Sequence, residues 1–148
     1  MQKPLTKSKL KKTGNITESS NDIGDPASNQ TIPSEHLEQC RFISRFRKKF
    51  PGVRIIAIPN GGWRDIKTAA RLKAEGVTKG VPDLFIPEWR FWIEMKRQKG
   101  GVVSEEQKDW LVYLNSIRYT AVVCHGADEA MQVANIVAEQ IAAWERSK

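Results

Sequence analysis

The sequence predicts a mixed α/β domain with a central mixed β-sheet flanked by helices, and three observations lead to this fold class. Segments with helical spacing of apolar residues alternate with short β-branched runs, in the order α, β, α, β, β, α, β, α. A chain of 148 residues, 40% of them hydrophobic, is long enough to bury one core without disulfides. No apolar run approaches the roughly 20 residues that cross a bilayer, so no membrane partner is expected.

Residues 1–33 differ in composition from the rest of the chain. They contain no aromatic residue, many Ser, Thr and Asn, and scattered Pro and Gly. Such a segment buries too little apolar area to offset its ordering entropy, so we predict a disordered, basic N-terminal tail before a folded domain at 34–148. Its first twelve residues hold five lysines and no acid, which leaves two interpretations open, a DNA-contacting arm or a solubilising tail: Lys3, Lys7, Lys9, Lys11 and Lys12.

The first helix is predicted to begin after the N-cap residue Ser34 and to run to about Phe50. Apolar residues recur there at helical spacing: Leu37, Phe42, Ile43 and Phe46. The Pro-Gly pair at 51–52 ends this helix. The β-branched run VRIIAI at 53–58 predicts a strand, and PNGGW at 59–63 interrupts it.

The middle of the chain predicts a helix followed by a hairpin. Residues 65–75 favour a helix, with Gly76 just beyond it as a C-terminal stop. Two short apolar segments at 83–86 and 90–97 then predict strands, and a tight turn at 87–88 is expected to join them.

The last third predicts a helix, a strand and a helix. Ser104 and Gln107 form a capping-box pattern that opens a helix from about 105 to 117. The segment TAVVC at 120–124 predicts a further core strand, and the final helix is expected to run to about Trp144.

Ionised residues interrupt the apolar hairpin. Side chains two apart share a strand face, so Glu94 and Lys96 are expected on one exposed or cleft-lining face, with Ile93 and Met95 in the core. Asp83 begins the preceding strand, and two carboxylates brought together repel unless a cation lies between them. Oxygen ligands without sulfur or imidazole favour Mg²⁺ or Mn²⁺ over zinc. The alternative is a solvated cross-strand ion pair.

This pattern looks like the PD-(D/E)XK nuclease signature, carried by Pro82, Asp83, Glu94, Met95 and Lys96. The surrounding sequence resembles one branch of that superfamily, the VRR-Nuc domain family in its stand-alone phage or bacterial form. The resemblance spans about residues 34–135. It is carried by EHLEQ at 35–39, IPNGGWR at 58–64, AARLKAEGVTKGVPDLFIP at 69–87, WIEMKRQKGGVVSEEQKDWL at 92–111 and AVVCHGADEA at 121–130.

The resemblance implies a restriction-endonuclease-like core and metal-dependent hydrolysis of DNA phosphodiester bonds with Mg²⁺ or Mn²⁺. Asp83, Glu94 and the backbone carbonyl of Met95 would bind the ion, which would polarise the scissile phosphate and acidify a bound water. Lys96 would orient that water or stabilise the charge that develops on the phosphate oxygens.

The resemblance also implies a further acid on the first helix. Glu35 fits that position best and is a further candidate metal ligand, but Glu38 lies one turn away on nearly the same face, so both remain open. Gln107 matches a family position that lines the site; its alternative role is the capping-box partner of Ser104. The candidate catalytic residues are therefore Glu35, Asp83, Glu94, Lys96 and Gln107.

A basic surface is expected beside this site. The loop that holds Asn60, Gly61, Gly62 and Arg64 permits close backbone approach and bidentate contact of the arginine with phosphate, whereas the alternative is an ordinary turn. The same face is expected to continue through three further cations: Arg71, Lys73 and Lys79.

Charge and resemblance together predict DNA as the partner. The formal charge of +7 and the pI near 9.6 favour a polyanion. Small stand-alone relatives, often encoded by phages, resemble Holliday-junction resolvases, which implies branched DNA and a homodimer. Two distant cysteines without a secretory peptide favour a reducing cytoplasm, here that of a bacterial or phage-infected host cell. The open alternatives are a nuclease for linear or flap DNA, a non-catalytic DNA-binding module on a nuclease scaffold, and a structural protein whose charges are solvated.

Overall fold

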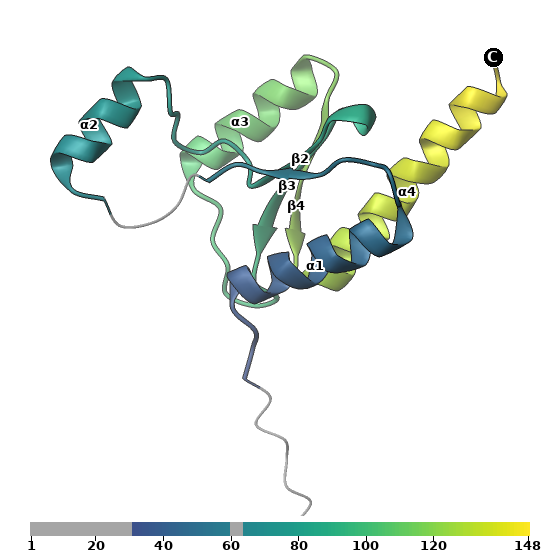
Figure 1. The fold of residues 1–148 in the computed structure, drawn as a ribbon, viewed down its shortest axis with the longest axis horizontal. Coiled ribbons are helices and arrows are strands. Elements are labelled where there is room, and N and C mark those ends of the chain that lie inside the picture. Colours follow the sequence, from purple (N-terminus) through teal and green to yellow (C-terminus); the bar gives the residue numbers. More distant parts are fainter. Residues whose placement is uncertain (1–30, 60–63) are drawn as a thin grey trace, which may run out of the picture. The chain divides into compact units, whose positions relative to one another are not determined.

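The computed structural model describes residues 31–59 and 64–148, so residues 1–30 of the tail predicted at 1–33 lie outside this range. In the described part, four strands form one sheet and four α-helices flank it, as the sequence predicts (Figure 1). No helix of this part is both long and apolar enough to cross a bilayer. In chain order the elements are α1 (Glu35–Lys49), β1 (Ile56–Ala57), α2 (Ile66–Ala74), β2 (Leu84–Ile86), the 3₁₀ turn η1 (Pro87–Trp89), β3 (Phe91–Lys96), α3 (Glu105–Ser116), β4 (Thr120–His125) and α4 (Ala127–Arg146).

The sheet is mixed and has the order β1-β2-β3-β4. The pairs β1/β2 and β2/β3 are antiparallel, whereas β3 and β4 are parallel and are joined by the crossover helix α3. Ile93 and Met95 of β3 are fully buried in a core that α1 and α4 share with the sheet. The opposite face of β3 is therefore the one that carries Glu94 and Lys96.

Local capping signals fix the helix ends at the predicted residues. The Ser34 hydroxyl accepts a hydrogen bond from the Leu37 N–H at 3.2 Å, which satisfies a free donor at the start of α1. Both bonds of the capping box between Ser104 and Gln107 are present at the start of α3. Gly76 ends α2 with a φ of 97°, a left-handed conformation that glycine adopts without steric cost.

The strand predicted at 53–58 is much shorter in the structure, because only Ile56–Ala57 pairs as β1. Val53 still belongs to the turn after α1, since its N–H donates to the Phe50 carbonyl. The partner strand β2 offers only three residues, and the ladder ends where the Ile58 N–H donates to the Asp83 carbonyl at 2.7 Å. The segment is thus a short edge strand rather than a central one.

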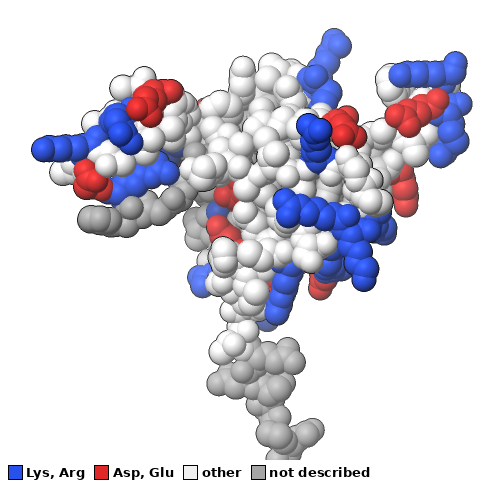
Figure 2. Space-filling view, viewed as in Figure 1, with Lys and Arg blue, Asp and Glu red and all other residues white. Residues whose placement is uncertain are grey.

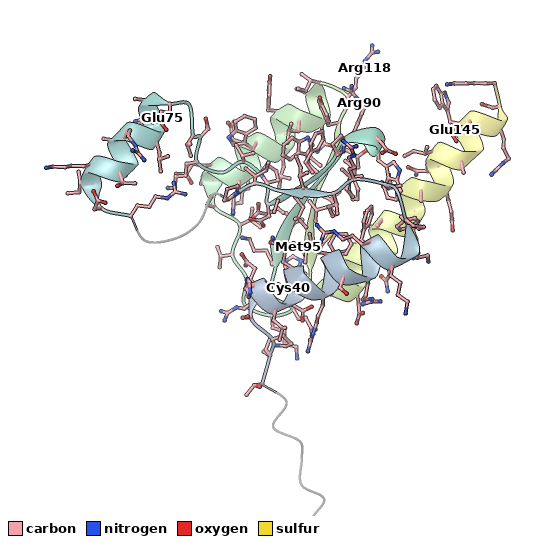
Figure 3. The ribbon with its side chains drawn as sticks, in the orientation of Figure 1. Cys40, Glu75, Arg90, Met95, Arg118 and Glu145 are labelled. Atoms are coloured by element: carbon pink, nitrogen blue, oxygen red, sulfur yellow. The ribbon has the colours of Figure 1, made fainter. Side chains whose placement is uncertain are left out.

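The tight turn predicted at 87–88 is also wrong in detail. The chain forms the turn η1 (Pro87–Trp89) and then passes through Arg90, whose φ is 50°. The Arg90 guanidinium donates to the carbonyls of Arg118 and Ile117, at 3.2 and 3.3 Å, so it ties this turn to the segment before β4 (Figure 3). These long-range bonds account for a left-handed conformation at a residue that rarely adopts it.

The loop that leads into β2 is held against the first turn of α3. Gly80 has a φ of 86°, and a Cβ atom there would lie 2.6 Å from the backbone carbonyl carbon of Glu106. The Trp110 indole N–H donates to the Lys79 carbonyl at 3.2 Å, and the Lys79 ammonium binds the Glu106 carboxylate at 2.7 Å. Because Asp83 follows Gly80 by only three residues, these contacts help to position its carboxylate at the start of β2.

Candidate active site

The hairpin of β2 and β3 brings the predicted acidic pair together. Leu84 lies opposite Ile93, and one further step of this register places Asp83 opposite Glu94. The Asp83 carboxylate turns toward β3 and accepts a hydrogen bond from the Met95 N–H at 2.8 Å. The expected meeting of the two carboxylates is thus present.

Glu94 and Lys96 are more deeply buried than a face exposed to solvent would allow. Only 1% of Glu94 and 5% of Lys96 are exposed. The Lys96 ammonium donates to Glu94 Oε1 at 2.8 Å. The second oxygen, Oε2, is buried and has no hydrogen-bond donor among the described residues. A buried carboxylate oxygen without a donor is costly, so this atom is an acceptor available to a cation.

Burial and mutual repulsion perturb the three ionised groups. Burial raises the pKa of Glu94 to about 7, and the charges of Asp83 and Glu35 add to this, against the opposing bond from Lys96. Burial also raises the pKa of Asp83, although the Met95 N–H and Lys96 oppose it. Burial alone would lower the pKa of Lys96, but the hydrogen bond and charge of Glu94, with the other carboxylates, raise it overall.

The shift at Glu94 predicts a pH-dependent stability in EDTA. Folding raises the Glu94 pKa from 4.5 to about 7, so the folded protein binds this proton more tightly than the unfolded chain. The resulting stabilisation is complete below about pH 4.5 and is lost as the pH rises through about 7. We expect the free energy of unfolding to fall by about 2 kcal/mol between pH 5 and 8 in urea titrations, with solvent screening included.

The isosteric variant Glu94→Gln is the control for this prediction, because its amide does not titrate. Its free energy of unfolding should change less with pH than that of the parent, by the amount assigned to Glu94. Equal pH dependence in the two proteins would show that Glu94 does not carry the effect. Lys96 stays protonated across this window, since its raised pKa lies above 10.5.

The structure separates the roles of the two acids on α1. A carboxylate oxygen of Glu35 lies 3.7 Å from the Lys96 ammonium, and this side chain is 45% exposed. Glu38 is 1% exposed and accepts hydrogen bonds from the Ala127 N–H at 2.7 Å and the Gln98 amide at 2.8 Å. Glu35 therefore joins the cluster, whereas Glu38 caps the start of α4.

Gln107 fulfils both roles that the sequence left open. Its side-chain carbonyl accepts the Ser104 N–H at 2.9 Å, and the Ser104 hydroxyl accepts the Gln107 N–H at 3.2 Å. At the same time its amide nitrogen donates to Glu94 Oε1, the oxygen that Lys96 also binds. The first turn of α3 therefore orients the Glu94 carboxylate.

Carboxylate chemistry at this site fits a hard divalent cation. Within residues 31–59 and 64–148, no group of three or more His, Cys, Asp or Glu side chains has a metal-binding arrangement. Asp83 and Glu94 form a pair, and the donor-free Oε2 of Glu94 is the atom that fits a cation. With so few protein ligands, such an ion would keep several water molecules, as Mg²⁺ commonly does.

The predicted DNA-contacting residues are only partly brought together. Asn60, Gly61 and Gly62 lie outside the described residues. Arg64, Lys73 and Lys79 line one hollow of about 630 Å³ between α2 and the loop that follows it.

Two of these predicted cations are engaged with acids. Arg71 lies 3.6 Å from Glu75 on its own helix and does not line this hollow. The Lys79 ammonium binds Glu106 so closely that the pKa of this carboxyl falls to about 2. Lys73 and Arg64 are therefore the cations here that keep their charge free of a carboxylate among the described residues.

The sequence alone did not predict that Glu38 caps α4, or that the Gln98 amide donates a hydrogen bond to Glu38. The Glu38 bond joins residues 89 positions apart, and no local pattern signals such a pair. A glutamate on the core side of a helix, at the spacing of Phe42 and Phe46, was the one available hint.

Comparisons with known proteins cover this whole cluster. Residues 29–128 match the family model described as the VRR-NUC domain. A solved structure described as a VRR-NUC domain protein is 28% identical, with a TM-score of 0.59 over 71% of this chain and 88% of that chain. A search of curated proteins gives no match.

Proposed function

Because the chain belongs to the VRR-NUC domain family, which is of nuclease type, we propose that it is a DNA endonuclease dependent on Mg²⁺ or Mn²⁺. One observation carries the proposal. Glu94 is buried beside Asp83 and Lys96, with one carboxylate oxygen that has no donor among the described residues. A solvated ion pair would not bury these charges, and this burial supports a catalytic role for the cluster.

Different residues of the cluster would bind the metal ion and stabilise the reacting phosphate. Asp83 and Glu94, with the Met95 carbonyl, would hold the ion, and Glu35 is the further acid close to the cluster. Bound there, the ion would supply Lewis-acid polarisation of the phosphate and a water of lowered pKa. Lys96 would stabilise the negative charge that develops on the phosphate oxygens.

Hydrogen bonds involving Gln107 and Asp83 would hold the two carboxylates of the site in position. Gln107 donates to Glu94 Oε1 and so restrains the rotation of that carboxylate. Its other oxygen, Oε2, is left without a donor among the described residues. Asp83 is fixed through its bond from the Met95 N–H. Preorganised groups of this kind cost no rearrangement when the phosphate arrives.

We further propose branched DNA as the substrate and a homodimer as the active form. The positive charge supports a phosphate-rich partner. The buried Glu94 and Lys96 mark one candidate active site in the described part of the chain. One site cuts one strand, so symmetric cleavage of a junction requires two copies, which a two-fold dimer supplies.

A single assay tests the proposed function. A four-way junction and a linear duplex of matched sequence are incubated with the parent protein in Mg²⁺, in Mn²⁺ or in EDTA, and products are resolved on denaturing gels. We expect paired nicks in the junction with either metal, no cleavage in EDTA, and at least about 10²-fold slower cleavage by Glu94→Gln.

Three outcomes would contradict parts of this proposal. Absence of cleavage with both metals would leave a non-catalytic DNA-binding module. Equal cleavage of the duplex would remove the preference for branched DNA. A complex of one protein chain with one junction, measured by light scattering, would contradict the proposed homodimer.

A further inference from the structure

A row of four cations lies along one side of α1: Arg41, Arg45, Lys48 and Lys49. We call it the α1 basic flank. Arg41, Arg45 and Lys49 follow one another at intervals of four residues and Lys48 lies three residues after Arg45, so these side chains share a side of the helix. Lys and Arg side chains gather over α1 in Figure 2. None of these four residues belongs to the site built around Glu94.

The flank borders a groove between α1 and α4. Arg45, Lys48 and Lys49 line a hollow of about 430 Å³ together with Met131 and Asn135 of α4. Three long cations around one open hollow form a surface that an anionic chain can enter. The two α4 residues carry no formal charge.

Two of the four cations on the flank keep their charge free of an ion pair among the described residues. Lys48 and Lys49 form no ion pair among the described residues, whereas Arg45 is paired with Asp128. Arg41 lies 3.9 Å from Glu38, whose carboxylate already accepts two shorter hydrogen bonds. The two unpaired lysines and the weakly paired Arg41 can bind a phosphate backbone and gain free energy by releasing its counterions.

The flank lies on the same helix as Glu35, so its distance from the candidate active site can be derived from the helix rise. α1 begins at Glu35, beside Lys96, and rises about 1.5 Å per residue, so the flank lies about 9–21 Å along the helix from that acid. Phosphates of one DNA strand recur about every 3.4 Å along the duplex axis. A row of about 12 Å therefore matches three to four phosphates.

We propose that the α1 basic flank is a second DNA contact, which binds the phosphate backbone about 10–20 Å along α1 from Glu35. This proposal rests on the proposed function, since it needs DNA at the Glu94 cluster. The contact is made to phosphates alone and is therefore independent of base sequence. It holds a part of the substrate that the catalytic cluster does not touch.

The test measures binding of a four-way junction in EDTA, where cleavage is not needed, by fluorescence anisotropy from about 50 to 200 mM salt. The triple variant Arg41→Gln/Lys48→Gln/Lys49→Gln is compared with the parent. Each lost phosphate contact removes about 0.9 from the log–log salt slope, so we expect the slope to shrink by about 2 to 3. Affinity at about 50 mM salt should fall by about 10- to 100-fold.

A charge-matched variant shows whether position or net charge is responsible. Arg118→Gln/Arg146→Gln/Lys148→Gln removes three cations from the turn before β4 and the end of α4, away from the flank. We expect it to bind within about threefold of the parent, with nearly the same salt slope. Equal losses in the two triple variants would overturn the proposal, because they would reflect net charge alone.

Two further measurements distinguish a DNA contact from a loss of folding and from a surface for an acidic protein. Circular dichroism and thermal unfolding should show the flank variant folded, as expected for exposed substitutions. Loss of binding to a polyglutamate peptide with unchanged DNA binding would assign the flank to an acidic protein partner and overturn the proposal. Parent protein that binds but does not cleave DNA would refute the proposed function alone.

Discussion

Replacement of Lys96 with Met is expected to lower the rate of DNA cleavage by about 10²- to 10⁴-fold in Mg²⁺. The Lys96 ammonium lies 2.8 Å from Glu94 and 3.7 Å from Glu35, two of the candidate catalytic carboxylates. Met keeps a similar unbranched stem, which packs where a Cβ atom at Gly101 would approach Lys96 Cβ to 2.9 Å. The loss should therefore appear in the chemical step, measured as the rate constant of single-turnover cleavage of the junction.

Lys99→Met is the matched control, since Lys99 lies three residues further along and is exposed. We expect its cleavage rate to stay within about twofold of the parent. The Lys96 variant leaves Glu94 without its buried partner and is expected to be less stable. The double variant Glu94→Gln/Lys96→Met should recover that stability without recovering cleavage. Cleavage by Lys96→Met at the parental rate would remove Lys96 from the mechanism.

Truncation of Phe46 to Ala should cost about 3–5 kcal/mol of unfolding free energy, the largest stability effect that we predict. The Phe46 side chain is fully buried. Its ring lies 5.7 Å from that of Phe42, 5.1 Å from Phe50 and 5.2 Å from Trp89, measured between centroids. Ala would remove these aromatic contacts and leave a cavity between α1 and η1.

Urea titration of Phe46→Ala and Phe50→Ala in parallel measures this effect. Phe50 packs against the same cluster but is only partly buried, so we expect about half the loss at that position. Equal losses would indicate that burial does not set the cost. Because α1 carries Glu35, the Phe46 variant should also cleave more slowly at temperatures near its unfolding midpoint.

Much of the fold follows from signals that act within a few residues. The capping residue Ser34, the stop at Gly76 and the capping box of Ser104 each satisfy backbone groups of their own helix, so they are visible in the sequence. The two-residue period of β3 likewise places Glu94 and Lys96 on one face. These elements could be predicted because the interactions that define them join residues close together in the sequence.

The remaining features depend on contacts across the chain. The length of β1 depends on how much of β2 it meets, and the turn at Arg90 depends on the carbonyls of Ile117 and Arg118. The choice between Glu35 and Glu38 depends on the Ala127 N–H, which becomes a partner only when α1 packs beside α4. No pattern of neighbouring residues encodes such distances.

The Gln107 side chain bonds to both Ser104 and Glu94, and this affects how the phenotypes of variants should be interpreted. One amide group completes the cap of α3 and restrains the Glu94 carboxylate, so a single substitution there alters helix stability and site geometry together. Substitutions at positions 104 and 94 should then be epistatic, although these residues share no direct bond among the described contacts. A genetic screen for activity would recover helix-capping alleles alongside catalytic ones, and the two kinds would look alike.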